Sequence, residues 1–178
     1  FRDKPTSAGF DSFALNIDGN TVDAVRRGGI DLSLVNTAVG AFSITNNQVT
    51  GVEDGPALTP DAISVSLIGT NVAQEATNVL RKSFIEGNLI GVSAAGAVGQ
   101  ISRNGIFFTA QEASEVQDLQ IRNNTIQNLL GNGIAFDRQD KATLHTVNPE
   151  SDQVRAVTIA NNSVTLAAQN GISLNVQN

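Results

Sequence analysis

The amino-acid sequence predicts an all-β fold in which short strands recur along the chain and stack on one another. A six-residue phrase occurs five times, and a second, strand-like phrase follows each copy. The 178 residues are 40% hydrophobic and only 16% charged, so they suffice for one buried core. We therefore expect a single domain over residues 1–178, belonging to a longer or assembling protein.

The first phrase reads aliphatic, any residue, Gly or Asn, Asn, any residue, aliphatic. Its copies begin at Ile17, Ile44, Ile85, Ile121 and Ile159. Gly and Asn most readily adopt the left-handed αL conformation, so the third position predicts a sharp bend between two strands. The residues expected in the αL bend are Gly19, Asn46, Gly87, Asn123 and Asn161.

The fourth position of this phrase is always asparagine. These residues are Asn20, Asn47, Asn88, Asn124 and Asn162. When successive repeats stack, their side-chain amides lie one above another, and each can hydrogen-bond to the next. The phrase therefore predicts a structural ladder of asparagines, with the flanking aliphatic side chains pointing into the core.

The second phrase places an aliphatic residue after a small or turn residue and another apolar residue two positions later. Its copies begin at Gly29, Ala62, Gly105, Gly133 and Gly171. This period of two predicts a short strand with one buried face. A repeat of roughly 25 residues, with at least two strands and sharp bends, is typical of a parallel β-helix. The regular leucine framework of a leucine-rich repeat is missing from the sequence, and a propeller blade would not explain the bend in every copy.

We expect five coils within residues 16–176, and a sixth if Phe10–Leu15 forms another before them. Longer spacings between phrases predict inserted loops or short helices. Residues 71–82 fit either a short helix or an extended strand, whereas 110–118 read as an acidic loop or one helical turn. Residues 91–99 read as a flexible loop or a close-packing surface, and 51–61 as a structured loop.

The polar insertion 137–153 holds the residues that catalysis or metal binding would need. Asp137 and Asp140 could bind Ca²⁺ through oxygen, and His145 could act as a general base. Arg138 or Lys141 could act as a base or hold a substrate carboxylate. A solvated loop explains the same residues, and we expect no catalytic site, no bound metal and no cofactor.

Charge and composition argue against several partners. The net charge is −6, and the basic doublets Arg26-Arg27 and Arg81-Lys82 lack neighbouring aromatics, so we expect no nucleic-acid binding. No run of about 20 apolar residues predicts membrane insertion. The absence of cysteine excludes disulfides and thiolate metal sites. Glu86 and Arg122 occupy the same position in consecutive repeats, which predicts an ion pair between them.

The phrases Ile-x-Asn-Asn-x-Ile and Asn-Gly-Ile-x-Phe resemble the repeats of pectate-lyase-like parallel β-helix proteins, over roughly residues 10–176. The resemblance implies a single-stranded, right-handed β-helix, or solenoid. That superfamily includes polysaccharide lyases and hydrolases, phage tailspikes and bacterial surface adhesins. The fold therefore does not select the function.

The polar, weakly charged exterior and the ends favour a non-enzymatic structural role. No amphipathic helix follows the last phrase to cover the strand edges, and residues 1–15 could serve as a cap or a donated segment. We expect an extracellular or cell-surface bacterial module of an adhesin or filament, which presents loops or assembles through its ends. Its partners would be its own copies, neighbouring coils, or a polysaccharide or host-surface ligand. The alternative is a polysaccharide lyase, hydrolase or tailspike-like depolymerase.

Overall fold

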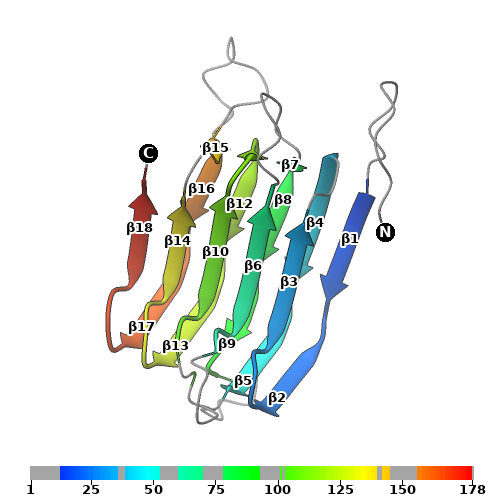
Figure 1. The fold of residues 1–178 in the computed structure, drawn as a ribbon. Helices are drawn as coiled ribbons and strands as arrows, with labels where there is room; N and C mark the ends of the chain where they lie inside the picture. The colour runs from blue at the N-terminus through cyan, green and yellow to red at the C-terminus, as the bar shows by residue number, and fades with distance from the viewer. Residues whose placement is uncertain are drawn as a thin grey trace.

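The computed structural model describes residues 13–35, 39–52, 60–69, 78–92, 101, 103–139, 142–144 and 156–177. In these residues the chain is all-β, with 18 strands, no helix and parallel pairing throughout. The strands form three sheets, and Figure 1 shows the earliest strands at one edge and the latest at the opposite edge. No described helix is long and apolar enough to span a membrane.

The first sheet contains the strands that precede each asparagine bend. They are β1 (Phe13–Asp18), β4 (Val39–Thr45), β7 (Asn78–Leu80), β8 (Ser83–Glu86), β11 (Ser114–Val116), β12 (Leu119–Arg122), β15 (Thr143–Leu144) and β16 (Val157–Ala160). Their order is β15-β11-β7-β4-β8-β12-β16, with β1 also paired to β4. In each later repeat, two short strands thus occupy the stretch that β4 covers as a single strand.

The second sheet contains the strands that follow the bend, and the third contains the strands of the second phrase. The second sheet holds β2 (Thr21–Val25), β5 (Gln48–Val52), β9 (Leu89–Ile90), β13 (Thr125–Leu129) and β17 (Ser163–Ala167). The third holds β3 (Ile30–Val35), β6 (Ile63–Ile68), β10 (Ile106–Gln111), β14 (Ile134–Arg138) and β18 (Ile172–Val176). The chain visits the three sheets in this order five times, and each visit is one repeat.

The register places equivalent residues of the two phrases directly beside one another. Ile44 pairs with Ile85, and Ile85 with Ile121, and all three side chains are fully buried. In the third sheet Ile63, Ile106 and Ile134 form a second buried column. Each column packs apolar side chains of successive repeats together, and burying them stabilises the stack. The predicted inward orientation of these aliphatic residues is confirmed.

All five residues at the third position of the first phrase have positive φ, between 54° and 68°, as predicted. A second bend, which we did not predict, lies within the second sheet at Ala24, Gly51, Asn128 and Leu166, with φ of 52° to 61°. Leucine rarely adopts this conformation, so Leu166 carries a local strain of about 1–2 kcal/mol.

One prediction for the inserted segments needs correction, and for another segment the structure favours one of the two alternatives. Residues 110–118 do not form a single loop or a helical turn, because Ala110 and Gln111 end β10 and Ser114–Val116 form β11. Ala110, Ser114 and Val116 are all buried, and pairing of β11 with β7 outweighs the weak local preference for a helix. Within 71–82, Asn78–Leu80 form strand β7, which favours the extended alternative there, and 70–77 lie outside the described residues.

The first repeat also differs from expectation. Phe13–Leu15 belong to β1 and pair with β4, so they do not start a sixth repeat. The rest of the proposed cap, residues 1–12, lies outside the described residues, as do 93–99 of the small-residue insertion and 53–59 of the proline-containing loop. Five repeats are therefore described.

Candidate functional site

The fourth-position asparagines are hydrogen-bonded in series from the first repeat to the fifth. Nδ2 of Asn20 donates to Oδ1 of Asn47 at 3.0 Å, and Asn47 donates to Asn88 at 3.1 Å. Asn88 and Asn124 continue the series, each at 2.9 Å, to Asn162. The backbone N–H of each of the first four residues donates to the same Oδ1 as its side chain does. We call this series the first ladder; its N–H groups face the next repeat.

A second ladder, which we did not predict, precedes the strands of the third sheet. Nδ2 of Asn170 donates to Oδ1 of Asn132 at 3.0 Å, and Asn132 donates to Asn104 at 3.0 Å. Asn104 then donates to Oδ1 of Asp61 at 2.8 Å. Its N–H groups face the preceding repeat, opposite to the first ladder. The signal in the sequence was an Asn or Asp just before Gly-Ile or Ala-Ile.

Asp61 terminates the second ladder, and its chemistry explains why. The equivalent residue of the first repeat is Gly28, which has no side chain to accept a further amide donor. A carboxylate needs no acceptor, so aspartate closes the series without leaving a buried N–H unpaired. Burial raises the pKa of Asp61, although hydrogen bonds from Asn104 and the charge of Arg103, 3.7 Å away, partly oppose the rise.

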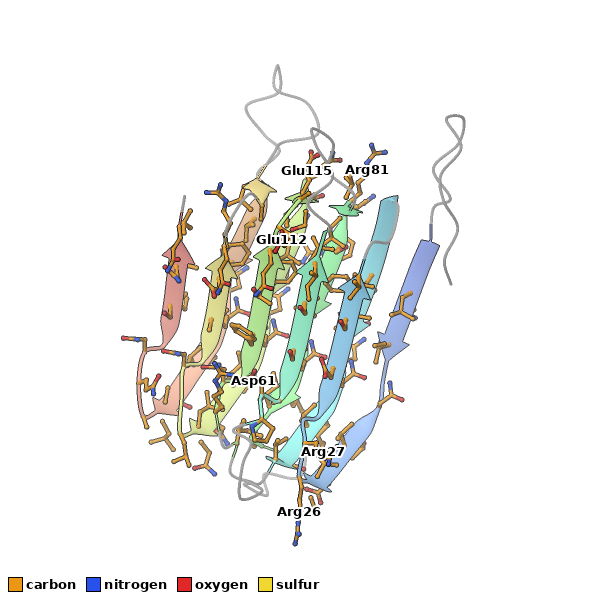
Figure 2. The ribbon with its side chains drawn as sticks, in the orientation of Figure 1. Arg26, Arg27, Asp61, Arg81, Glu112 and Glu115 are labelled. Carbon is orange, nitrogen blue, oxygen red and sulfur yellow. The ribbon has the colours of Figure 1, made fainter. Side chains whose placement is uncertain are left out.

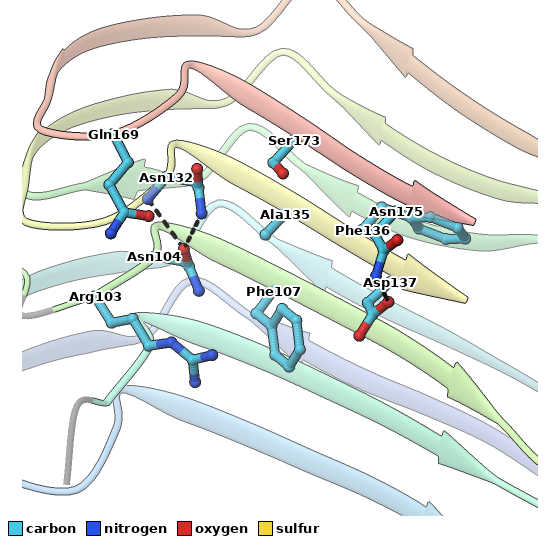
Figure 3. Close-up of a pocket in the computed structure, with 10 residues that line it drawn as sticks. All are labelled: Arg103, Asn104, Phe107, Asn132, Ala135, Phe136, Asp137, Gln169, Ser173 and Asn175. Atoms are coloured by element: carbon cyan, nitrogen blue, oxygen red, sulfur yellow. Dashed lines mark hydrogen bonds between the residues drawn. The ribbon is translucent and has the colours of Figure 1, made fainter. Parts of the chain in front are cut away.

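A shallow groove of about 330 Å³ lies on the outer face of the third sheet, over β10, β14 and β18. Phe107, Ala135 and Ser173 are adjacent in the register and share this outer face. The large ring of Phe107 is followed by two small side chains, and the difference in size produces the hollow. Figure 3 shows the Phe107 side chain beside Arg103, with Ala135 and Ser173 along the neighbouring strands.

The walls of the groove are polar. The guanidinium carbon of Arg103 lies 5.3 Å from the centroid of the Phe107 ring. On the other side, Nδ2 of Asn175 donates to Oδ1 of Asp137 at 2.8 Å, and Gln139 also donates to Asp137. A flat ring flanked by a cation, a carboxylate and amides offers stacking and hydrogen bonds to a polar, uncharged ligand.

The structure brings only one of the predicted chemical residues into this groove. Asp137 lines the groove. Arg138 is the next residue in β14, so its side chain lies on the opposite face of the strand. The Nε of Arg138 donates to the backbone carbonyl of Ala142 at 2.5 Å. Asp140, Lys141 and His145 lie outside the described residues. The predicted cluster is therefore not assembled in the part that is described.

The predicted ion pair between Glu86 and Arg122 is present, with an N–O distance of 3.0 Å. Arg122 also lies over the ring of Phe84, 5.4 Å from its centroid. Hydrogen bonds from Arg122 and Asn123 lower the pKa of Glu86. The pair is partly exposed, which limits its worth to at most about 1 kcal/mol.

The basic doublets lie apart from each other. Figure 2 shows Arg26 and Arg27 at one end of the strands and Arg81 toward the other, where Glu115 also lies. The Nε of Arg81 donates to the side-chain oxygen of Gln117 at 2.9 Å. Within the described residues, no group of three or more His, Cys, Asp or Glu side chains could hold a metal ion.

Comparison of the chain with protein-family models, with curated proteins and with solved structures found no match.

Proposed function

We propose that the chain is a single-stranded, right-handed parallel β-helix that serves as a non-enzymatic structural or adhesive module of an extracellular bacterial surface or filament protein. The observation that carries the proposal is the unbroken register of equivalent residues through five repeats. Neighbouring strands of each sheet come from consecutive repeats, as we would expect of a solenoid. The resemblance of both phrases to pectate-lyase-like repeats supports the same architecture.

The polar exterior supports a structural role over catalysis. Glycoside hydrolysis generally needs two carboxyl groups facing each other across a substrate. Among the described residues that line the groove, Asp137 is the single carboxylate, and two amide side chains already donate to it. The site thus offers a surface for contact and lacks a visible pair of acid and base.

A screen for polysaccharide cleavage tests this proposal. The purified chain and its Asp137→Asn variant are incubated with neutral and acidic polysaccharides, and new reducing ends and unsaturated products are measured. We expect no product from either protein. Cleavage by the wild-type chain would overturn the non-enzymatic proposal, and its loss in Asp137→Asn would place the chemistry in the groove.

The groove itself favours a second candidate function, binding of a polysaccharide with or without cleavage. Phe107 provides an apolar platform, and Arg103 with Asp137 and Asn175 provides polar edges. Affinity electrophoresis in polysaccharide gels tests it, with Phe107→Ser as the groove variant and Phe84→Ser as the control, because Phe84 carries a similar arginine contact on the first sheet. Retardation that Phe107→Ser abolishes and Phe84→Ser preserves would support binding.

A further inference from the structure

The last repeat leaves apolar side chains uncovered at its free edge, formed by β16, β17 and β18, which we call the tail. Ile172 is 50% exposed and Leu174 is 62% exposed. Their register partners in the preceding repeat, Ile134 and Phe136, are at most 3% exposed. Residues 156–177 contain no charged side chain. Solvent-exposed strand edges are usually protected by charges, so the tail lacks the normal barrier to strand pairing.

The two ladders also end at the tail, with opposite hydrogen-bonding groups. In the first ladder Asn162 presents its backbone N–H toward the position of a next repeat, because the preceding asparagines use that group for the next Oδ1. In the second ladder Asn170 presents its Oδ1 in the same direction, as Asn132 does toward Asn170. The tail thus offers one donor site and one acceptor site at fixed positions.

The free edge of β1, β2 and β3, which we call the head, offers the complementary groups. Asn20 presents Oδ1, the atom that each later residue of the first ladder uses to accept from the repeat before it. Gly28 holds the position of the second ladder, and its backbone N–H takes the place of the N–H that Asn104 and Asn132 donate backward. Both positions match the tail.

We infer that the tail binds the head of a second copy of this chain, so that β1, β2 and β3 of the next copy extend the three sheets beyond β16, β17 and β18. The inference rests on the proposed function and specifies its partner. Stacking tail to tail would turn the second copy over, so its strands would run antiparallel to β16, β17 and β18 and could not continue the parallel register of the three sheets. Head-to-tail stacking pairs donor with acceptor at both ladders.

The bends make this stacking geometrically possible. The first bend has φ of 68° at Gly19 and 54° at Asn161, and the second has 52° at Ala24 and 53° at Leu166. The first and last repeats therefore follow the same backbone path at both bends. A head can lie on a tail as one repeat lies on another within the chain.

One small substitution separates stacking from folding. A Cβ added at Gly133 would lie 2.3 Å from Val164 and 2.5 Å from the carbonyl oxygen of Gly171, both in the next repeat. Gly171 holds the same position in the last repeat, and a Cβ there meets no described atom within 4 Å. Ala62 holds this position in the second repeat, so the stack can adjust to a methyl group there. Gly171→Ala should leave the single chain intact, and its new methyl group would crowd Val22 and Gly29 of a stacked copy and weaken the contact.

Sedimentation velocity over a range of concentrations tests the inference on the full 178-residue chain. We expect the wild type to form a series of species that lengthens with concentration, and Gly171→Ala to raise the concentration for assembly at least about tenfold. Leu174→Lys in the tail should act likewise. Leu130→Lys is the matched control, because Leu130 is 46% exposed but lies in the fourth repeat, away from both edges. Circular dichroism melts confirm that each variant is folded.

A mixing experiment tests the polarity. Leu15, in β1, is 36% exposed at the head, so Leu15→Lys blocks the head alone and Leu174→Lys blocks the tail alone. Neither variant should assemble by itself, and an equimolar mixture should form a one-to-one complex that grows no further. A wild type that stays monomeric at all concentrations overturns the inference. A dimer that persists in Leu15→Lys alone overturns it too, since that result means tail-to-tail pairing.

The outcome is separable from that of the proposed function. If the chain is monomeric and cleaves no polysaccharide, the proposed non-enzymatic function stands and only the head-to-tail inference fails. If the chain stacks and also cleaves a polysaccharide, the proposed non-enzymatic function fails and the head-to-tail inference stands.

Discussion

Replacing Asn124 with leucine should remove the centre of the first ladder with little change in side-chain volume. Asn124 is 1% exposed, and its side chain donates to Asn162 and to the carbonyl of Ile85, each at 2.9 Å. Its Oδ1 also accepts the backbone N–H and the side-chain amide of Asn88. Asn124→Leu therefore breaks four hydrogen bonds inside a dry interior.

The expected loss follows from the groups that are left without partners. The backbone N–H of Asn88 loses its acceptor entirely, whereas the amide of Asn88 keeps the carbonyl of Ile44 at 2.9 Å. A buried polar group without a partner costs about 1–3 kcal/mol, and the weakened contacts to Ile85 and Asn162 add to this. We expect a total loss of about 2–4 kcal/mol in the free energy of unfolding.

Urea denaturation followed by circular dichroism measures the change, with Asn20→Leu as the matched control. Asn20 has the same place in the ladder but is exposed at the head, so its replacement should cost less than about 1 kcal/mol. Equal losses for the two variants, or a loss below about 1 kcal/mol for Asn124→Leu, would refute the view that burial makes the ladder stabilising.

Three further perturbations have clear expected results. Gly133→Ala should destabilise the fold by about 1–3 kcal/mol, because the next repeat must shift to admit its Cβ, whereas Gly171→Ala should leave the thermal midpoint of the monomer unchanged; equal midpoints would contradict the packing. Leu166→Asn should stabilise the chain by about 0.5–1 kcal/mol in urea titrations, since asparagine tolerates a φ of 53°; a loss would argue against strain there. Glu86→Gln should cost at most about 1 kcal/mol at pH 7. Because the folded state lowers the pKa of Glu86, this contribution is present above its ordinary value of 4.5 and disappears as the pH falls through the folded pKa, so a deficit that persists at low pH would be inconsistent with the ion pair.

The repeated phrases made much of the fold predictable. The Gly/Asn-Asn bend specifies both a backbone conformation and a hydrogen-bonding side chain, so Asn123 and Asn124 could be assigned separate structural roles from sequence alone. The alternation after each bend likewise identified Ile106 and Ile134 as buried. At these positions the local residue preferences and the repeat pattern indicate the same structure, so the structure could be predicted from the sequence.

The features that escaped prediction depend on neighbours from other repeats. Asp61 reads as an ordinary loop carboxylate until the second ladder places Asn104 against it. Ser114 reads as part of a polar loop until β7 pairs beside it and buries it. The groove is of the same kind, because Phe107 and Ser173 lie far apart in the sequence and meet only through the register of β10, β14 and β18.

The opposite directions of the two ladders have a consequence for the electric field of the molecule. A row of aligned amide groups sums its dipoles, as the peptide groups of a helix do, and a longer row would build up partial charge at its ends. Here the first ladder directs its N–H groups toward the fifth repeat and the second directs them toward the first. The two dipoles oppose each other and largely cancel. Adding repeats therefore extends the hydrogen-bonded rows without accumulating charge separation along the axis, so the dipoles of the ladders set no limit on length.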